Sequence, residues 1–431
     1  MNDQHLLASV PVRITLGRVL FAVTGIYITQ TMISTLAMQS VPALVRAAGG
    51  SLALIGATTL FMLPWALKFL WAPTIERWRL PAGSQKRRSR PLILGGQMAL
   101  AGLLLLAALT GYLKRAHPFQ ADELFWLFGF FMAAGLVAAT LDIACDGFCV
   151  DQLSDGGYGW GNVAQVGGSY LGMMLGGGAF LLLAARYGWP FAAAGLAVMI
   201  MVFSLPMWRT AEPARSQPVA HRPSLGNALS RRSTWFGLLL IVGLNAGVRV
   251  VMPLSAPVLL DQGLDMASLG WLLGGGSIAA GLVGTLGGGL LIHSLGQWRA
   301  LYCAFVLQAI VLLTVALCLW LLPAGSALPV LMGLTVAQFI VTACSMVCVY
   351  AVLMGLSSPL QAGVDFTLFQ CADAGIAILG GTAGGVLAQY SGYSGSFFCA
   401  AGLTVAALVG LRIAHSIHKG RACKDRTASL C

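Results

Sequence analysis

The residues most capable of chemistry in this sequence lie in one segment, TLDIACDGFCVDQ, at positions 140–152. Within it lie three carboxylates and two thiols: Asp142, Cys145, Asp146, Cys149 and Asp151. Such a group could bind a metal ion, act as a catalytic dyad, or relay ions inside a membrane protein. Since no histidine lies nearby and no nucleophile stands beside an oriented base, we expect no metal site, no cofactor and no enzyme activity.

The remainder of the chain is too apolar for a soluble protein. Of its 431 residues, 58% are hydrophobic and 9% are charged, whereas an average soluble domain has about 25% charged residues. A soluble fold of this length could not cover so much apolar surface. We therefore expect an integral membrane protein whose partner is the lipid bilayer. The N-terminus shows no cleavage site after a short apolar core, so the first apolar run is expected to stay as a transmembrane helix.

Apolar runs of about 20 residues predict twelve transmembrane helices. Their expected bounds are 16–38, 51–72, 92–113, 124–148, 162–184, 190–208, 235–259, 268–291, 300–322, 328–354, 363–388 and 395–414. The predicted fold is all-α, with two pseudo-symmetric bundles of six helices. The expected parts are an N-terminal bundle (1–209), a basic cytoplasmic linker (210–234), a C-terminal bundle (235–417) and a cytoplasmic tail (418–431).

The basic charge of the chain follows its expected topology. The net charge is +11, which by itself could suggest nucleic-acid binding. The basic residues expected in outer loops are Arg46, Lys114, Arg115 and Arg186, and those expected within spans are Lys68 and Arg249. The other Lys and Arg residues lie at expected cytoplasmic positions, as the positive-inside rule requires. We therefore expect both termini in the cytoplasm and no nucleic-acid partner.

The two halves of the chain resemble each other. SVPALV (40–45) matches SAPVLL (255–260), and GGGAFLLLAARYGW (176–189) parallels LGGTAGGVLAQYSGY (379–393). Parallel halves of this kind are typical of a transporter with its substrate site between them, near the middle of the membrane. Glycines four residues apart indicate close helix packing, and they are also compatible with rocking of the halves: Gly168, Gly172 and Gly176; Gly284 and Gly288; Gly380 and Gly384.

Charged residues within the expected spans need a reason, because each costs about 2.5–3.5 kcal/mol on insertion scales. Asp142 and Asp146 are four residues apart and therefore share one helix face. Lys68 lies on the inner third of the second helix, with Glu76 and Arg77 at its mouth. These groups could form a cytoplasmic gate or a proton relay, or a static network of ion pairs that fixes the helix ends.

Two more charged residues are expected near mid-depth, Arg249 in the seventh helix and Asp373 in the eleventh. Arg249 is suited to binding an anion, because its guanidinium stays charged and bonds carboxylates in a bidentate way. Asp373 could carry a proton, or the two residues could simply neutralise each other. Polar residues that could bind substrate, or could make ordinary interhelical hydrogen bonds, are Tyr27, Gln30, Asn245, Tyr350 and Gln370.

Several motifs resemble those of the major facilitator superfamily. A degraded G-x-L-x-D-x-x-G-x-R signature follows the second and eighth helices, with Glu76 and His293 at the acidic position. LPWALKFLWAPTIERW, ATLDIACDGFCVDQL and GWGNVAQVGGSYLGMMLGGG resemble the group that holds the AmpG muropeptide permeases, the acetyl-coenzyme A transporters and the RhtX/FptX siderophore permeases. FLWAPTIERWRLP, followed by RRSRPLILGGQ, is most similar to the RhtX/FptX branch.

That resemblance implies a proton-coupled transporter of the bacterial inner membrane that imports a ferric siderophore of the pyochelin or rhizobactin class. It further implies a monomer with a functional link to an outer-membrane siderophore receptor. The first alternative is a permease for muropeptides or another anionic metabolite. The second is a drug efflux antiporter, which would favour a carboxylate in the first helix, where this sequence has none.

Overall fold

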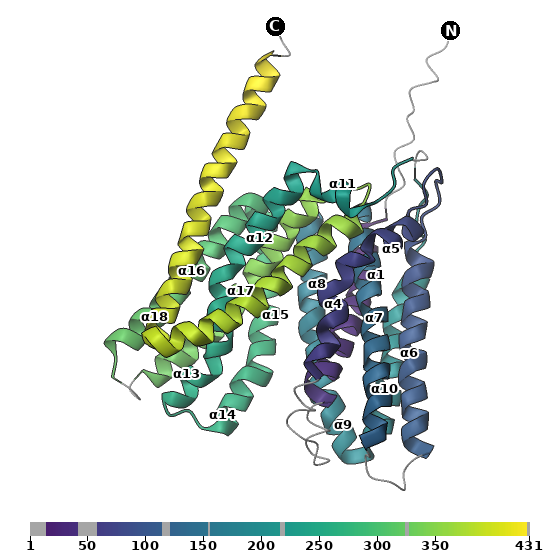
Figure 1. Cartoon of the computed structure of the whole chain (residues 1–431), viewed down its shortest axis with the longest axis horizontal. Helices are drawn as coiled ribbons and strands as arrows, with labels where there is room; N and C mark the ends of the chain where they lie inside the picture. The colour runs from purple at the N-terminus through teal and green to yellow at the C-terminus, as the bar shows by residue number, and fades with distance from the viewer. Residues whose placement is uncertain are drawn as a thin grey trace. The chain divides into compact units, whose positions relative to one another are not determined.

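The computed structural model describes residues 14–41, 58–113, 121–153, 156–215, 220–323 and 327–428, and these residues form helices and connecting turns without any β-strand (Figure 1). Long apolar runs become helices because a chain in hydrocarbon must satisfy every backbone N–H and C=O internally. Parts of the expected topology, namely residues 1–13, Arg46 and the pair Lys114 and Arg115, lie outside the described residues.

The described helices belong to two compact units. One is drawn from residues 1–234 and 350–371, and the other from residues 235–349 and 372–431. The sequence predicts 350–371 as part of the C-terminal bundle, yet in the structure this segment groups with the N-terminal helices.

The helices of the first unit follow the predicted spans closely. In chain order they are α1 (Leu16–Thr35) with the π-helical turn η1 (Leu36–Ser40), α6 (Ser89–Leu113), α7 (Ala121–Gln152), α8 (Tyr158–Met173) with the π-helical turn η4 (Met174–Ala179), α9 (Phe180–Tyr187), α10 (Trp189–Trp208) and the short α11 (Leu225–Leu229).

The predicted second helix, 51–72, is broken into short pieces. Residues 42–57 lie outside the described part of the chain. The pieces are the 3₁₀ turn η2 (Thr58–Met62), α4 (Leu63–Leu67), the 3₁₀ turn η3 (Lys68–Leu70) and α5 (Ala72–Arg79). Pro64 and Pro73 lie near the starts of α4 and α5. Proline is tolerated there because the first backbone N–H groups of a helix have no partner inside it. The break places Lys68 on a turn between two short helices.

The second unit contains the helices that follow the linker, together with parts of α17 and α18. In chain order the elements are α12 (Arg232–Val251), the 3₁₀ turn η5 (Met252–Leu254), α13 (Ser255–Asp261), α14 (Met266–Trp271), the π-helical turn η6 (Leu272–Gly276), α15 (Ser277–Leu295), α16 (Gln297–Leu321), α17 (Leu328–Leu356) and α18 (Ala362–Ala428).

Ten stretches within the described residues are long and apolar enough to cross a membrane. The tenth, Ala362–Arg412, has 51 residues, which is far more than the roughly 20 that one crossing needs. The backbone at Gly392 leaves the helical region, with φ 69° and ψ 178°, and divides this stretch into the predicted eleventh and twelfth helices. The second of the twelve expected helices is described only in part, by the short apolar run Leu60–Leu70.

Glycines in α8 and η4 allow the backbone of α1 to approach closely. A Cβ atom built on Gly172 would lie 2.5 Å from the carbonyl oxygen of Ile28, and one built on Gly176 would overlap the carbonyl oxygen of Met32. In the second unit, Gly384 of α18 meets the carbonyl oxygen of Val250 in α12 in the same way. The predicted role of these glycines in packing is therefore confirmed, because no side chain fits at these crossings.

The repeat seen in the sequence extends to a backbone turn. Gly188, between α9 and α10, has φ 88° and ψ 152°, close to the values of Gly392 in α18. These two glycines end the parallel motifs ARYG and QYSG. Both need the positive φ that glycine adopts without steric cost. Each half of the chain therefore uses a glycine turn after the helix that packs on its first helix.

Candidate functional site

A buried lysine connects two distant parts of the chain in the first unit. The Nζ atom of Lys68 donates to Oδ2 of Asp142 in α7 and to the amide oxygen of Gln370 in α18. The side chains of Lys68 and Asp142 are 3% and 11% exposed. An ion pair this deeply buried keeps both charges compensated inside an apolar bundle. The predicted pairing of the second and fourth helices is therefore present between these two residues.

Asp146 lies one helical turn after Asp142 but has different partners. The hydroxyl of Tyr27 in α1 donates to Oδ1 of Asp146 at 2.8 Å, and Nε2 of Gln165 in α8 donates to the same oxygen at 3.0 Å. The Tyr27 hydroxyl also lies 3.4 Å from the Cys149 sulfur. Asp146 is fully buried, and its Oδ2 has no hydrogen-bond partner among the described residues.

Gln30 completes this polar cluster from the same helix face as Tyr27. In the amide orientation that satisfies both residues, its nitrogen lies 2.8 Å from Oδ1 of Asp142 and its oxygen lies 3.1 Å from the backbone nitrogen of Asp142. We name this group the α7 cluster, and its members are Tyr27, Gln30, Lys68, Asp142, Asp146, Gln165 and Gln370. The structure thus brings six of the predicted polar and charged residues on helices 1, 2, 4 and 11 into one group with Gln165.

The second unit holds a separate ion pair, between Arg249 of α12 and Asp373 of α18. Nη2 of Arg249 lies 2.5 Å from Oδ2 of Asp373, and Nε lies 3.4 Å from Oδ1. Asn245, one turn earlier in α12, donates from Nδ2 to Oδ1 of Asp373 at 2.8 Å. The Arg249 side chain is 17% exposed and that of Asp373 is 5% exposed. The guanidinium is therefore the more accessible member of the pair.

Tyr350, the remaining predicted substrate contact, lies in α17. Its ring packs edge-on against Phe366, with 5.7 Å between the ring centroids. The substrate-binding role predicted for Tyr350 stays a prediction.

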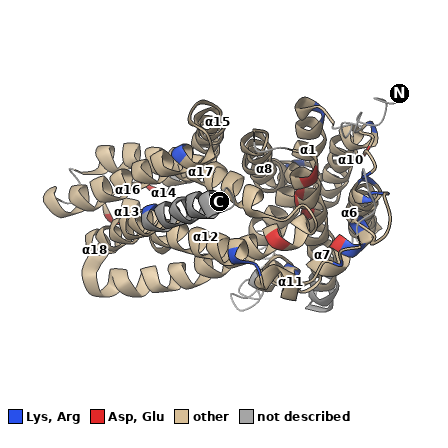
Figure 2. Cartoon of the chain, turned by 90° about the horizontal axis from the view of Figure 1, so that it is seen from above, with Lys and Arg blue, Asp and Glu red and all other residues tan. Residues whose placement is uncertain are grey.

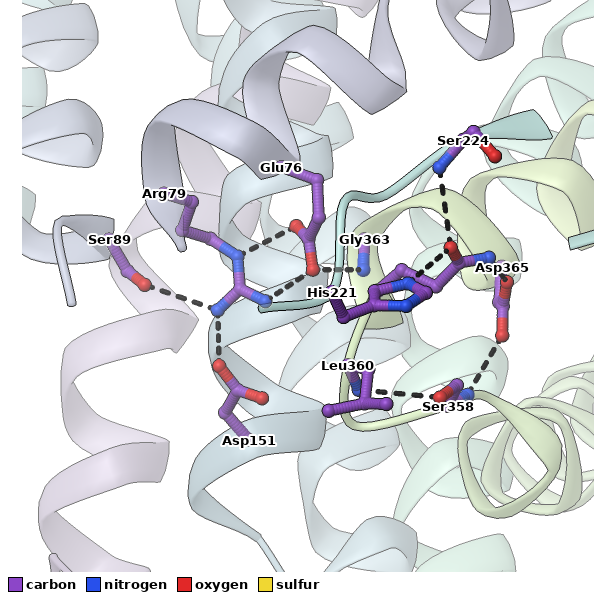
Figure 3. Close-up of polar contacts among 11 residues, drawn as sticks. Glu76, Arg79, Ser89, Asp151, His221, Ser224, Ser358, Leu360, Gly363 and Asp365 are labelled. Atoms are coloured by element: carbon purple, nitrogen blue, oxygen red, sulfur yellow. Dashed lines mark hydrogen bonds and ion pairs between the residues drawn. The ribbon is translucent and has the colours of Figure 1, made fainter. Parts of the chain in front are cut away.

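Arg79 occupies the centre of a third charged group, which we name the α5 cluster (Figure 3). Its Nε and Nη2 atoms donate to the two carboxylate oxygens of Glu76 at 2.8 and 2.6 Å. Nη1 donates to Oδ2 of Asp151 at the end of α7, and to the Ser89 hydroxyl at 3.3 Å. Oε1 of Glu76 also accepts from the backbone N–H of Gly363 at 3.3 Å. A Cβ atom on Gly363 would lie 2.5 Å from Oε2 of Glu76, so this approach needs glycine.

The charges in the α5 cluster stabilise each other. Burial alone would lower the pKa of the Arg79 guanidinium, but the carboxylates of Asp151 and Glu76 outweigh that effect and raise it above its usual value. The Arg79 and Glu76 side chains have no exposed surface, and that of Asp151 is 3% exposed. The group is therefore a fully desolvated ion network that remains charged.

Arg77, which the sequence analysis groups with Lys68, Glu76 and the carboxylates of the fourth helix, has a different described contact, and its predicted gate role stays a prediction. Arg77 is exposed, and its Nε donates to the backbone carbonyl of Pro223 at 2.9 Å. Residues two positions apart on a helix face opposite sides, so Arg79 points inward where Arg77 does not. The spacing of Glu76 and Arg79, three residues apart, was the signal in the sequence that could have identified the pair. His293, at the acidic position of the second half, is exposed.

A further network that the sequence analysis missed joins the polar linker to the start of α18. Arg231 donates to Oδ2 of Asp365, which also accepts from the backbone N–H of Ser358 at 2.8 Å. Gln361 donates to Oδ1 of Asp365 at 2.8 Å, and its own amide oxygen lies 3.0 Å from Nε2 of His221 (Figure 3). Asp365 is fully buried. Linker residues therefore fix the turn that leads into α18.

Figure 2 shows how sparse the charged residues are along the helices. Since each charge inside an apolar bundle carries a cost, the few that are present should have partners or a function. Lys68 with Asp142, Arg79 with Glu76 and Asp151, and Arg249 with Asp373 are opposite-charge sets. Asp146 differs, because its described hydrogen bonds come from a phenol and an amide, neither of which is a cation.

Comparison with known proteins gives a family match over most of the chain. The model of the Major Facilitator Superfamily matches residues 19–321. An anhydromuropeptide permease of Escherichia coli (strain K12) is 29% identical over 263 residues, which cover 59% of this chain and 51% of the permease. An uncharacterized protein of Haemophilus influenzae is 28% identical over 287 residues, which cover 64% of each chain. The match thus spans about half the length of the permease.

Two solved structures share the fold. A bacterial homologue of the iron transporter ferroportin, in the outward-facing state, has a TM-score of 0.66 and 16% identity, and the match covers 92% of this chain and 98% of that one. FucP, a major facilitator transporter in the outward conformation, has a TM-score of 0.63 and 13% identity, and covers 92% and 97%. At such low identities these likenesses concern the arrangement of helices and not the substrate.

Proposed function

Because the chain belongs to the Major Facilitator Superfamily, we propose that this multi-pass membrane transporter imports an anionic solute of the muropeptide type, driven by protons. The observation that carries the substrate class is the 29% identity to an anhydromuropeptide permease over 263 residues. A muropeptide bears carboxylates on its peptide, so a site for it needs a cation that stays charged inside the membrane. We place the protein in the bacterial inner membrane as a monomer, with both termini in the cytoplasm.

Arg249 is the cation that suits this role. A guanidinium remains protonated at any physiological pH and can bond a carboxylate with two parallel N–H groups. In the second unit Asp373 compensates its charge, which lowers the cost of keeping it within an apolar helix. The 17% exposure of its side chain leaves part of the guanidinium accessible. A substrate carboxylate would compete with Asp373 for Arg249, and Asn245 would hold the displaced aspartate.

Within the first unit, the α7 cluster supplies the second candidate contact for an anion. Lys68 is bonded to Asp142 and to the neutral amide of Gln370. An ammonium with a neutral partner can exchange that partner for a substrate oxygen without losing its carboxylate. Tyr27, Gln30 and Tyr350 remain proposed substrate contacts, because they are polar side chains within the expected spans.

The gate is proposed at the α5 cluster, with Arg79 in the role that the sequence suggests for Arg77. Glu76 accepts from the backbone of Gly363 while Arg79 holds the Glu76 carboxylate in place. Breaking that contact would release the segment 350–371 from the helices of the first unit. Coupling roles for Asp142 and Asp373 are also proposals.

A ferric siderophore is the second candidate substrate. It is favoured by the segment FLWAPTIERWRLP, which resembles the RhtX/FptX branch, and it would bring the functional link to an outer-membrane receptor. The comparisons support the muropeptide alternative better, because the named relative is a muropeptide permease. The ferroportin homologue is similar in fold alone.

Transport into proteoliposomes tests the proposal. The purified chain should accumulate radiolabelled anhydromuropeptide when the outside is more acidic than the lumen, and a protonophore should abolish the accumulation. Arg249→Ala should reduce uptake at least tenfold while the protein still inserts and folds. Arg299→Ala is the matched control, because Arg299 is exposed in the same unit, and it should transport normally.

Each alternative has its own outcome in the same vesicles. Accumulation of a radiolabelled ferric siderophore in place of anhydromuropeptide would establish the second candidate. Export of a cationic dye in exchange for protons would establish an efflux antiporter. Normal anhydromuropeptide uptake by Arg249→Ala would contradict the assignment of the anion site.

A further inference from the structure

Asp146 is a buried carboxyl group whose described hydrogen bonds come from no cation, so its protonation state needs an explanation. It is fully buried, Oδ1 accepts two hydrogen bonds, and Oδ2 has no hydrogen-bond partner among the described residues. An ionised carboxylate has two equivalent oxygens that both need donors. A neutral carboxylic acid has one carbonyl oxygen that accepts and one hydroxyl oxygen that carries the proton. The contacts of Asp146 match the neutral acid, with Oδ1 as the carbonyl oxygen.

The charges around Asp146 lead to the same assignment. The groups that face it are Tyr27 from α1, Lys68 from η3, Asp142, Cys145 and Cys149 from α7, and Gln165 from α8. Among these, Lys68 is the one cation, and it is already bonded to Asp142. With both aspartates ionised, the buried α7 cluster would hold an uncompensated negative charge, which desolvation strongly disfavours. One proton on Asp146 makes the cluster neutral.

We propose that Asp146 is the group that carries the coupled proton through the transport cycle. The inference rests on the proposed proton-driven transport and names the residue that performs it. In the protonated state the O–H bond is at Oδ2, while Tyr27 and Gln165 hold Oδ1. On release the O–H bond breaks, the proton passes to water and Asp146 is left as a carboxylate. Asp142 is ionised as well and already paired with Lys68, so release leaves the α7 cluster with one negative charge, which the next proton neutralises.

Asp146 could instead serve only to hold α1 and α8 against α7, and the substitution Asp146→Asn separates the two roles. The asparagine side chain keeps a carbonyl oxygen at the Oδ1 position, so the hydrogen bonds from Tyr27 and Gln165 remain. It cannot release a proton. The variant should therefore fold with the stability of the parent chain and resemble its protonated state permanently.

Infrared spectroscopy of the purified full chain tests the proton directly and needs no substrate. The parent chain should show the C=O stretching band of a protonated carboxyl at neutral pH, and Asp146→Asn should lack that band. Asp261→Asn is the control, since Asp261 is an exposed acid that accepts from the Tyr393 hydroxyl, and it should leave the band in place. Identical spectra for the parent chain and Asp146→Asn would overturn the assignment.

Proteoliposome transport tests coupling. With anhydromuropeptide as the probe, Asp146→Asn should still exchange labelled for unlabelled solute, but its accumulation ratio under a proton gradient should fall to one. Accumulation equal to that of the parent chain would refute a carrier role for Asp146. If the parent chain moves no anhydromuropeptide, the proposed substrate fails, and the infrared band still decides whether Asp146 holds the proton.

Discussion

Replacing Arg79 by glutamine should unfold the first unit far more readily than any exposed substitution nearby. Arg79 makes four side-chain hydrogen bonds, two to Glu76, one to Asp151 and one to Ser89. Arg79→Gln leaves two carboxylates buried without a cation, and breaking a buried ion pair from one side costs about 3–5 kcal/mol. We expect a loss of unfolding free energy in that range.

Two further variants refine the magnitude. Arg79→Lys keeps the charge but not the planar fork that reaches both oxygens of Glu76, and it should cost roughly 1–3 kcal/mol, as the loss of a charged hydrogen bond does. The triple variant with Glu76→Gln, Arg79→Gln and Asp151→Asn should be more stable than Arg79→Gln alone. Neutralising a whole buried network removes the unpaired charges that breaking it leaves behind.

Arg77→Gln is the matched control on the same short helix. Arg77 is exposed and its side chain donates to a backbone carbonyl, so the change should stay within about 0.5 kcal/mol. Unfolding can be followed by denaturant titration in detergent micelles with a thiol-reactive dye. Cys145 and Cys149 are buried and react only after unfolding, whereas the exposed Cys303 and Cys399 give a constant background. If Arg79→Gln were no less stable than Arg77→Gln, the proposed ion network would be refuted.

Two other substitutions test the packing and the α7 cluster. Gly384→Ala should destabilise the second unit by about 1–3 kcal/mol through overpacking, since its Cβ would overlap the Val250 carbonyl oxygen. Gly385→Ala, which meets no described atom within 4 Å, should be neutral or stabilising in the same unfolding titration, and equal effects would contradict the packing argument. Lys68→Gln should lower the free energy of unfolding by about 3–5 kcal/mol and abolish uptake, because it leaves Asp142 buried and unpaired. Adding Asp142→Asn should restore the stability but not the transport. A double variant as unstable as Lys68→Gln would argue against the ion pair.

Much of the fold follows from the sequence because the bilayer imposes a local rule. A run of about 20 apolar residues must form a helix to satisfy its own backbone, and ten such stretches appear in the described residues close to their predicted bounds. Glycine spacing indicates the close crossings for an equally local reason, since residues four apart share one helix face. The broken second helix did not follow, because apolar composition does not distinguish one continuous helix from several short turns.

The sequence also identified most of the candidate residues, because a charged residue within an apolar segment can be recognised without knowing its partner in the fold. Lys68, Asp142, Asp146, Arg249 and Asp373 were all recognised in this way. The sequence analysis named Arg77 and not Arg79, because composition does not show which side of a short helix faces the protein. The tertiary structure shows Arg79 in contact with Glu76 and Asp151, while a gate role for either arginine stays a proposal.

Partner choice is what the tertiary structure alone decided. Lys68 meets Gln370 across 302 positions, and Glu76 meets Gly363 across 287. Asp142 and Asp146 share one helix face, yet the first received the lysine while the second received a tyrosine and a glutamine. Sequence determines which groups must be buried, because hydropathy is a property of each residue. Which cation, amide or hydroxyl compensates them depends on the positions of distant helices, and these exist only in the folded chain.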